Sequence, residues 1–309
     1  MDFNSLPVID LESENIINEL RDACTNFGFF FVKTNRFSSF QSCLTASKIF
    51  FNQSLEQKLE CKCNSYNLGY TSFQDETLSP LQTSGDTKEG YYIMKELNEN
   101  DKISYNLNYE NLWPSSQSLL IDWKSVMLQY HDDATELGVR LIRLIALSLG
   151  LSEDYFDSII TTKSTRLRLI KYGITPSDPN NGLYGAGEHS DYGLLTILGT
   201  NEVPGLEIYI GGQWLPIPPR LDCFIINLGD ALSILTNNFY CSTLHRVIIS
   251  GHNSDRYSAA LFFGPDSTAR IKPRKEFIHD NVINTTVDMS YGEYLGYKYS
   301  ITHTDYKKA

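Results

Sequence analysis

The periodicity of apolar residues changes from helical to β-type near Thr165, and this change restricts the folds that are possible. Between residues 116 and 149 apolar residues recur every three or four positions, and Gly150 follows where a helix C-cap glycine belongs. We predict a long helix there, with a bend or break near Asp132. Beyond Thr165 the pattern becomes short β-type runs at residues 167–172, 194–198, 206–210, 223–228, 243–250 and 257–263.

Glycine, proline and asparagine separate these runs, which favours a sandwich or jelly roll over a parallel sheet. Gly211-Gly212 is followed by Gln213-Trp214-Leu215, and this pattern is typical of a hairpin turn. The first 115 residues mix the two periodicities, with strands predicted at 6–11 and 28–32 and helices at 14–26 and 38–57. We therefore predict a mainly β protein with flanking helices, of the α+β class.

A polar passage rich in Gly, Ser and Thr, residues 64–88, is too long for a simple connection. Loops of that length usually cover a site or are disordered. Together with a predicted strand at 91–93, this passage could form a lid or could pack against the β-rich part, and the sequence leaves both open.

The acidic balance of the chain restricts its partners. Its 309 residues include 26 Lys and Arg against 37 Asp and Glu, a formal charge of −11 that disfavours nucleic acid and anionic membranes. We expect a small-molecule partner and no obligate protein partner.

No signal peptide or long apolar run is evident. The cysteines lack the pattern of a zinc site or disulfide framework, which predicts reduced thiols in a cytoplasmic protein: Cys24, Cys43, Cys61, Cys63, Cys223 and Cys241.

The tripeptide His-x-Asp occurs three times, and one occurrence suits a metal site. His131-Asp132-Asp133 lies in the helical pattern, where residues two apart face different directions, so we expect a solvated helix face. His303-Thr304-Asp305 lies in a polar tail, which we expect at the surface. His189-Ser190-Asp191 precedes a β-type run, and residues two apart in an extended backbone project to the same side. His189 and Asp191 can therefore bind one cation.

His245, 56 residues after His189 and within the extended run 243–249, is the candidate for a third ligand. Alone, such a strand histidine is more often a core residue than a ligand. Two imidazoles and one carboxylate on one face leave the opposite face of an octahedral ion open, which is the arrangement of catalytic Fe(II) sites rather than closed structural zinc sites. A hydrolytic zinc site is also compatible with these ligands.

Arg256 and Ser258 are two apart in a predicted strand and so share a face. A guanidinium offers a planar fork of donors that matches a carboxylate, and a neighbouring hydroxyl adds a hydrogen bond. The apolar residues 259–263 place this segment in the core rather than on an exposed edge strand. The pair therefore predicts a binding site for one end of a small dicarboxylate, which weighs against hydrolytic zinc.

The ordered set His189-x-Asp191, His245 and Arg256-x-Ser258 resembles the iron- and 2-oxoglutarate-dependent dioxygenase superfamily. The branch it resembles contains isopenicillin N synthase, anthocyanidin synthase and the gibberellin oxidases. The resemblance covers nearly the whole chain. Further similar motifs are Leu6-Pro7-Val8-Ile9-Asp10-Leu11, Gly28-Phe29-Phe30, Asn227-Leu228-Gly229-Asp230, Thr236-Asn237 and Ser242-Thr243-Leu244-His245-Arg246-Val247.

This resemblance implies a double-stranded β-helix, or jelly roll, that hydroxylates or desaturates a small organic molecule. It implies Fe(II) as the metal, 2-oxoglutarate as a cosubstrate that is converted to succinate and CO₂, O₂ as the oxidant and ascorbate as a supporting reductant. The implied iron ligands are His189, Asp191 and His245, and the implied residues for the distal carboxylate of 2-oxoglutarate are Arg256, Ser258 and Tyr172.

The sequence departs from the family pattern at two places. Ile170-Lys171-Tyr172-Gly173-Ile174 replaces an Asn-Tyr-Tyr-Pro-Pro motif, so Tyr172 has an ordinary strand tyrosine as its alternative interpretation. Lys33-Thr34-Asn35-Arg36 replaces an Asn-His-Gly turn, which we do not expect to affect the metal site. Phe262 shares the strand face of Arg256, so it is a candidate for lining the substrate pocket, with core packing as the alternative.

Two alternative functions stay open at this point. One is an oxidase of the isopenicillin N synthase or aminocyclopropane-carboxylate oxidase kind, which does not consume 2-oxoglutarate. The other is a catalytically inactive jelly-roll binding protein. For all three we expect one compact unit in two parts: residues 1–115, a mixed α/β region that packs on the core and contributes to the substrate pocket, and residues 116–309, the long helix, jelly roll and C-terminal helical tail.

Overall fold

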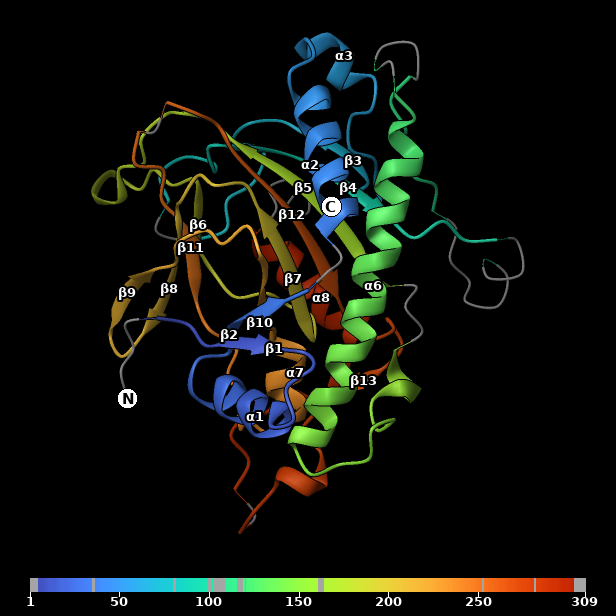
Figure 1. Ribbon diagram of the computed structural model, residues 1–309, viewed down its shortest axis with the longest axis vertical. Coiled ribbons are helices and arrows are strands. Elements are labelled where there is room, and N and C mark those ends of the chain that lie inside the picture. Colours follow the sequence, from blue (N-terminus) through green and yellow to red (C-terminus); the bar gives the residue numbers. More distant parts are fainter. Residues whose placement is uncertain are drawn as a thin grey trace.

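Two large β-sheets, a small two-stranded sheet and a layer of helices form the described part of the structure, a computed structural model (Figure 1). The described residues are 5–34, 37–79, 82–98, 102, 109–115, 119, 121–160, 164–251, 253–280 and 282–302. The strands are β1 (Val8–Asp10), β2 (Phe29–Lys33), β3 (Gly69–Thr71), β4 (Lys88–Met94), β5 (Arg166–Tyr172), β6 (Ala186–His189), β7 (Leu195–Thr200), β8 (Leu206–Ile210), β9 (Gln213–Pro216), β10 (Cys223–Leu228), β11 (His245–Val247), β12 (Arg256–Phe263), β13 (Arg270–Ile271) and β14 (Met289–Ser290).

Within the described residues, the larger sheet contains eight strands in the order β1-β2-β10-β7-β12-β5-β4-β3, and the smaller sheet contains four in the order β6-β11-β8-β9. Apart from the parallel pair β1 and β2, their neighbours run antiparallel. This confirms the predicted mainly β, jelly-roll type of fold. The helices are α1 (Ile16–Asn26), α2 (Phe37–Phe51), α3 (Leu55–Leu59), α6 (Trp123–Ser148), α7 (Asp230–Leu235) and α8 (Tyr291–Thr302), with 3₁₀ turns η1 (Asp157–Ile159), η2 (Pro179–Asn181) and η3 (Lys275–Phe277).

The larger sheet is covered on both faces. Figure 1 shows α6 running along one face with α1 and α2 beside it, while the smaller sheet lies on the other side. Because side chains alternate along a strand, β12 sends Tyr257 and Phe263 into the core beneath the helices and Arg256 and Ser258 into the space between the sheets. Burial on both faces explains why these strands are nearly continuous apolar runs in the sequence.

The predicted long helix is confirmed as α6, but a break near Asp132 is wrong. The helix is continuous through His131, whose side chain is fully buried, and Asp132, whose side chain is 56% exposed. A single helix therefore places consecutive polar residues on opposite faces and needs no interruption. The solvated face predicted for His131 is also wrong, because its ring packs inside with Nε2 3.3 Å from the carbonyl oxygen of Thr165.

The helix predicted at 38–57 is wrong as a single element. It divides into α2 and α3, and Ser54 between them has extended dihedral angles that interrupt the helix. The side chain of Ser54 accepts a hydrogen bond from the backbone N–H of Gln57, and the Gln57 side chain accepts one from the backbone N–H of Ser54. This reciprocal capping box begins a new helix rather than continuing the old one.

The hairpin predicted at Gly211-Gly212 is confirmed by the pairing of β8 with β9. Both glycines have positive φ values, 58° and 83°, which tight hairpin turns require and which glycine adopts at low cost. The β-type run 243–250 forms a shorter strand than predicted, β11, and its pairing with β6 is irregular between His245 and Val247.

The long passage predicted at 64–88 packs against the larger sheet instead of standing away from it. Two of its acidic residues, Glu76 and Asp86, are buried and form ion pairs with Lys88, and Glu76 also pairs with Arg168. Leu78 lines the cavities described below. Buried ion pairs therefore hold Glu76 and Asp86 against the larger sheet, and Leu78 lies beside the space between the sheets.

None of the six cysteines forms a disulfide. Among the described residues, no helix combines the length and the apolar composition that crossing a bilayer requires.

Candidate metal centre

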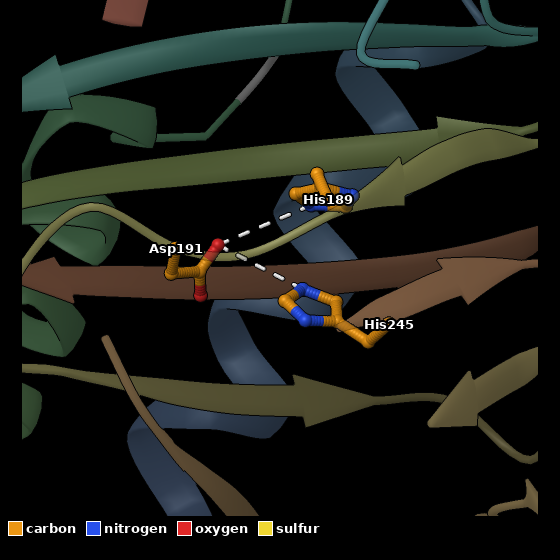
Figure 2. Close-up of side chains that lie close together, drawn as sticks. All are labelled: His189, Asp191 and His245. Carbon is orange, nitrogen blue, oxygen red and sulfur yellow. Dashed lines mark ion pairs between the residues drawn. The ribbon is translucent and has the colours of Figure 1, made fainter. Parts of the chain in front are cut away.

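The side chains of His189 and Asp191, two residues apart, meet the side chain of the distant His245 where β6 ends and β11 begins (Figure 2). His189 ends β6, His245 begins β11, and the two are direct partners in antiparallel pairing. Asp191 follows β6 by two residues. Its Oδ1 lies 4.0 Å from Nε2 of His189 and 3.7 Å from Nε2 of His245. One ligand atom from each residue lies within 4.8 Å of the other two, so the predicted metal ligands are brought together.

Backbone contacts orient both imidazole rings. Nδ1 of His189 lies 2.7 Å from the carbonyl oxygen of Gly187, and Nδ1 of His245 lies 3.2 Å from that of Thr243. A carbonyl can only accept, so each Nδ1 carries the proton and each Nε2 keeps the lone pair that a metal needs. Burial, reinforced by the neighbouring His245, lowers the pKa of His189 to about 3. That ring is therefore neutral near pH 7, as a metal ligand must be.

The Asp191 carboxylate is held by two neighbouring strands of the larger sheet. Its Oδ2 accepts hydrogen bonds from the hydroxyl of Thr196 in β7 at 2.5 Å and from Nδ2 of Asn227 in β10 at 2.8 Å. Burial raises the pKa of Asp191, but the two imidazoles and these hydrogen bonds bring the pKa below its ordinary value. The side chain is therefore ionised, with Oδ1 facing the imidazoles.

This donor set fits Fe(II). Two neutral imidazoles and one carboxylate are the ligands of non-haem iron sites with open positions, whereas a closed structural zinc site has four protein ligands. The other two His-x-Asp motifs add nothing to it. His131 lies on the buried face of α6, and His303-Thr304-Asp305 lies outside the described residues.

A buried arginine that has no carboxylate partner in the described part of the chain lies on the inner face of the larger sheet. The side chain of Arg256 is 2% exposed, and its Nε and Nη1 have no hydrogen-bond partner among the described residues. The hydroxyl of Ser258, two residues on and equally buried, also lacks one. Tyr172 is the direct cross-strand partner of Arg256, whose guanidinium lies 4.8 Å from the tyrosine ring centroid. Burial lowers the pKa of Arg256, and Tyr172 offsets this only in part.

These unsatisfied donors fit one end of a dicarboxylate such as 2-oxoglutarate. Unpaired buried donors cost free energy, and a carboxylate would satisfy both the guanidinium fork and the hydroxyl. The same cavity between the sheets is lined by Arg256, Ser258 and Tyr172 and by the three metal ligands. A dicarboxylate bound by Arg256 could therefore extend toward a metal at His189, Asp191 and His245.

A second cavity adjoins the metal ligands from the other side. His189 and Asp191 line both cavities, and so does Phe262, the predicted pocket residue. The residues of this second cavity that the sequence did not single out come from β4, β5, α8 and neighbouring segments: Tyr92, Ser164, Arg166, Arg168, Tyr192, Gly193, Gly264, Tyr291, Leu295 and Tyr299. Helix α8, near the C-terminus, thus forms part of its wall.

Two supporting residues, Thr196 and Asn227, were also missed as functional residues. Asn227 lies in the Asn-Leu-Gly-Asp motif, which resembles the family, but the motif does not say what its amide contacts. Thr196 is a polar residue within an otherwise apolar strand. A hydroxyl that faces the interior there could have indicated a residue that supports the metal site. Both contacts depend on the register of β7 against β10, in which Thr196 and Asn227 are direct partners.

Two family models match the chain. The model of the 2OG-Fe(II) oxygenase superfamily matches residues 164–265, and that of the N-terminal part of the non-haem dioxygenase in morphine synthesis matches residues 6–116. A probable iron/ascorbate oxidoreductase of Dictyostelium discoideum is 34% identical, covering 84% of this chain and 81% of the relative. A 2-oxoglutarate-Fe(II) type oxidoreductase of Emericella nidulans is 30% identical, covering 84% of this chain and 77% of the relative.

The fold is also similar to that of solved structures. A full-length protein of Neurospora crassa, solved in complex with alpha-KG, superposes with a TM-score of 0.83, at 26% sequence identity and with 96% of each chain covered. The same protein with alpha-KG and thymine gives a TM-score of 0.82, with the same identity and coverage.

Proposed function

The chain belongs to the 2OG-Fe(II) oxygenase superfamily, and from this premise we propose which residues perform its reaction. It is an iron- and 2-oxoglutarate-dependent dioxygenase, with Fe(II) as its metal and 2-oxoglutarate as its cosubstrate. We propose that it hydroxylates or desaturates a small organic molecule. The observation that carries the assignment of residues is that Arg256 is buried in the same cavity as the three metal ligands and has no carboxylate partner among the described residues.

Fe(II) would be held by His189, Asp191 and His245, and the distal carboxylate of 2-oxoglutarate by Arg256, Ser258 and Tyr172. The chemistry supplied when both are bound is the activation of O₂, coupled to decarboxylation of 2-oxoglutarate to succinate. Ascorbate would act only to keep the iron reduced.

The protein's own contribution is orientation and exclusion of water. Arg256 and Ser258 fix one end of the cosubstrate, so its reactive end reaches the metal in one orientation. The two sheets enclose the cavity, and Leu78 and Phe262 line both it and the second cavity. We propose the second cavity as the substrate pocket, with Phe262 between substrate and cosubstrate. The Neurospora structure with thymine supports a small molecule in such a pocket.

We infer that the two parts of the chain, residues 1–115 and 116–309, work as one catalytic unit. In support, β1 to β4 of the first part complete the sheet that carries β5, β7, β10 and β12 of the second. Leu78 and Tyr92 of the first part also line the proposed substrate pocket. Six unpaired cysteines suit a reducing compartment, and we propose the cytoplasm. The charge of −11 favours a small molecule over nucleic acid or an anionic membrane as the partner.

Release of CO₂ from carboxyl-labelled 2-oxoglutarate, with Fe(II), ascorbate and a panel of candidate substrates, tests this proposal. We expect release by the wild type and only background release by Asp191→Ala. The matched control is Asp133→Ala, which removes the carboxylate of the His-x-Asp motif in α6 and should retain release. Equal background rates in the wild type and Asp191→Ala over the whole panel would refute the proposal.

The isopenicillin N synthase or aminocyclopropane-carboxylate oxidase kind of reaction predicts a different outcome. Such an enzyme would turn over a substrate without consuming 2-oxoglutarate, so product would form with no labelled CO₂. An inactive binding protein would give neither product nor CO₂. The same assay therefore separates the three functions.

A further inference from the structure

Arg166 is a cation in the proposed substrate pocket that has no hydrogen-bond or ion-pair partner among the described residues. Its side chain is partly buried and lines the cavity beside the metal ligands His189 and Asp191. In the part of the chain that the structure describes, no hydrogen bond or ion pair involves its guanidinium. The exposed arginines of this acidic chain behave differently, since Arg220 and Arg270 each bind a neighbouring carboxylate.

The other arginine of the pocket is already neutralised. Arg168 donates to Oε2 of Glu76 at 2.5 Å, and Glu76 also binds Lys88 at 3.2 Å. Lys88 has a second carboxylate partner in Asp86. This buried group therefore contains two carboxylates and two cations and carries no net charge. Of the two arginines that line the pocket, Arg166 is the one whose positive charge has no counterion among the described residues.

The register of the larger sheet places Phe262 between Arg166 and the metal site. Arg166 pairs directly with Phe262, and Phe262 pairs directly with Thr196, which holds the metal ligand Asp191. Neighbouring strands lie about 4.8 Å apart, so the backbones of Arg166 and Thr196 are about 10 Å apart. A small molecule with one end at Arg166 would lie across the ring of Phe262 with its other end near the metal.

The remaining lining shows what such a molecule would be made of. Tyr92, Phe262, Tyr291 and Leu295 supply aromatic and aliphatic surface, which suits an apolar body. Ser164, two residues before Arg166, lines the same cavity and can add a hydroxyl donor beside the guanidinium. One guanidinium with one hydroxyl matches a singly charged carboxylate better than a doubly charged phosphate.

We infer that the substrate is a carboxylic acid with an apolar or aromatic body, whose carboxylate is bound by Arg166 with Ser164 beside it. The inference rests on the proposed function, because it assigns the second cavity to the substrate. It makes Arg166 the residue that selects acids over neutral analogues.

The test uses matched sets of phenylalkanoic acids of increasing chain length, each with its methyl ester and primary amide. Substrate-stimulated CO₂ release from labelled 2-oxoglutarate is measured with the full-length, Fe(II)-loaded protein. We expect at least one acid to stimulate release with a KM about 10- to 100-fold below those of its ester and amide, the factor expected for a charge-assisted hydrogen bond. Arg166→Gln should abolish this preference for the acid, and Arg166→Lys should retain part of it.

The control is Arg220→Gln, which removes an exposed arginine that lines neither cavity and should keep the wild-type preference. Esters or amides that stimulate release as well as the acids, acids that fail at every chain length, or an acid preference that persists in Arg166→Gln would each overturn the inference. A visible absorption band forms when 2-oxoglutarate binds to Fe(II) in the protein without O₂. This band distinguishes failure of the proposed function from failure of the inference about Arg166. If the wild type lacks this band, the proposed function fails. If the band forms and the acid preference is absent, only the inference about Arg166 fails.

Discussion

The hydroxyl of Thr196 donates to Oδ2 of Asp191 at 2.5 Å, which leaves Oδ1 to face the two imidazoles. Thr196 belongs to the larger sheet, whereas His189 and His245 belong to the smaller one. The hydrogen bond thus ties the carboxylate ligand to one sheet and presents it to histidines on the other. The geometry of the metal site depends on how the two sheets are packed.

Thr196→Val should weaken iron binding without removing a ligand. The substitution deletes one hydrogen bond that orients Asp191, and losses of this kind typically cost about 10- to 100-fold in metal affinity. We expect that loss in an anaerobic Fe(II) titration. The control is Thr135→Val, which deletes a buried threonine hydroxyl in α6, outside both cavities. Equal Fe(II) affinity in Thr196→Val and the wild type would show that Thr196 does not position the ligand.

Substitutions in the 2-oxoglutarate pocket should follow a fixed order. Arg256→Gln should raise the KM for 2-oxoglutarate about 10- to 100-fold, because it removes a charge-assisted contact in a buried site. Arg256→Lys should not restore affinity, since an ammonium lacks the planar fork. Ser258→Ala should cost less than Arg256→Gln, and Tyr172→Phe least, because its ring still packs beneath the guanidinium. Steady-state kinetics with varied 2-oxoglutarate checks the order, and a larger effect from Tyr172→Phe than from Arg256→Gln would contradict it.

Glu76→Ala should destabilise the protein strongly. It leaves the buried Arg168 without its carboxylate and takes one of two partners from Lys88, and breaking a buried ion pair in this way costs about 3–5 kcal/mol. Urea denaturation measures the free energy of unfolding. The exposed pair of Glu12 with Arg140 is the comparison, because Glu12→Ala should change stability by less than about 1 kcal/mol. Similar losses in the free energy of unfolding from Glu76→Ala and Glu12→Ala would show that burial of the Glu76 ion pairs does not increase their contribution to stability.

The sequence predicted those parts of the site in which local geometry decides the outcome. His189 and Asp191 are two residues apart at the end of a strand, and Arg256 and Ser258 are two residues apart within another strand. Side chains alternate between the two faces of a strand, so this spacing was enough to predict that the members of each pair point to the same side. That His245 would join His189 was inferred from its extended run and from the residues that accompany it, and the family resemblance agreed. The structure explains the meeting by the direct pairing of β11 with β6.

What could not be predicted depends on contacts between distant segments. His131 is buried, with Nε2 3.3 Å from the carbonyl oxygen of Thr165, whereas the polar His131-Asp132-Asp133 motif had suggested a solvated helix face. Arg166 lines the pocket because β5 pairs with β12 in one register, and a shift by one residue would turn its side chain toward the helices. The break between α2 and α3 is different, since the Ser54-x-x-Gln57 capping pattern was present in the sequence.

The central claim is that 2-oxoglutarate bridges Arg256 and a metal held by His189, Asp191 and His245. Anaerobic titration of the Fe(II)-loaded protein with 2-oxoglutarate, followed by visible absorption, tests it most directly. A weak charge-transfer band should grow in the wild type to a saturating value, require about 10- to 100-fold more 2-oxoglutarate in Arg256→Gln, and not form in Asp191→Ala. Absence of the band in the wild type, or the same half-saturating concentration in Arg256→Gln, would contradict the claim.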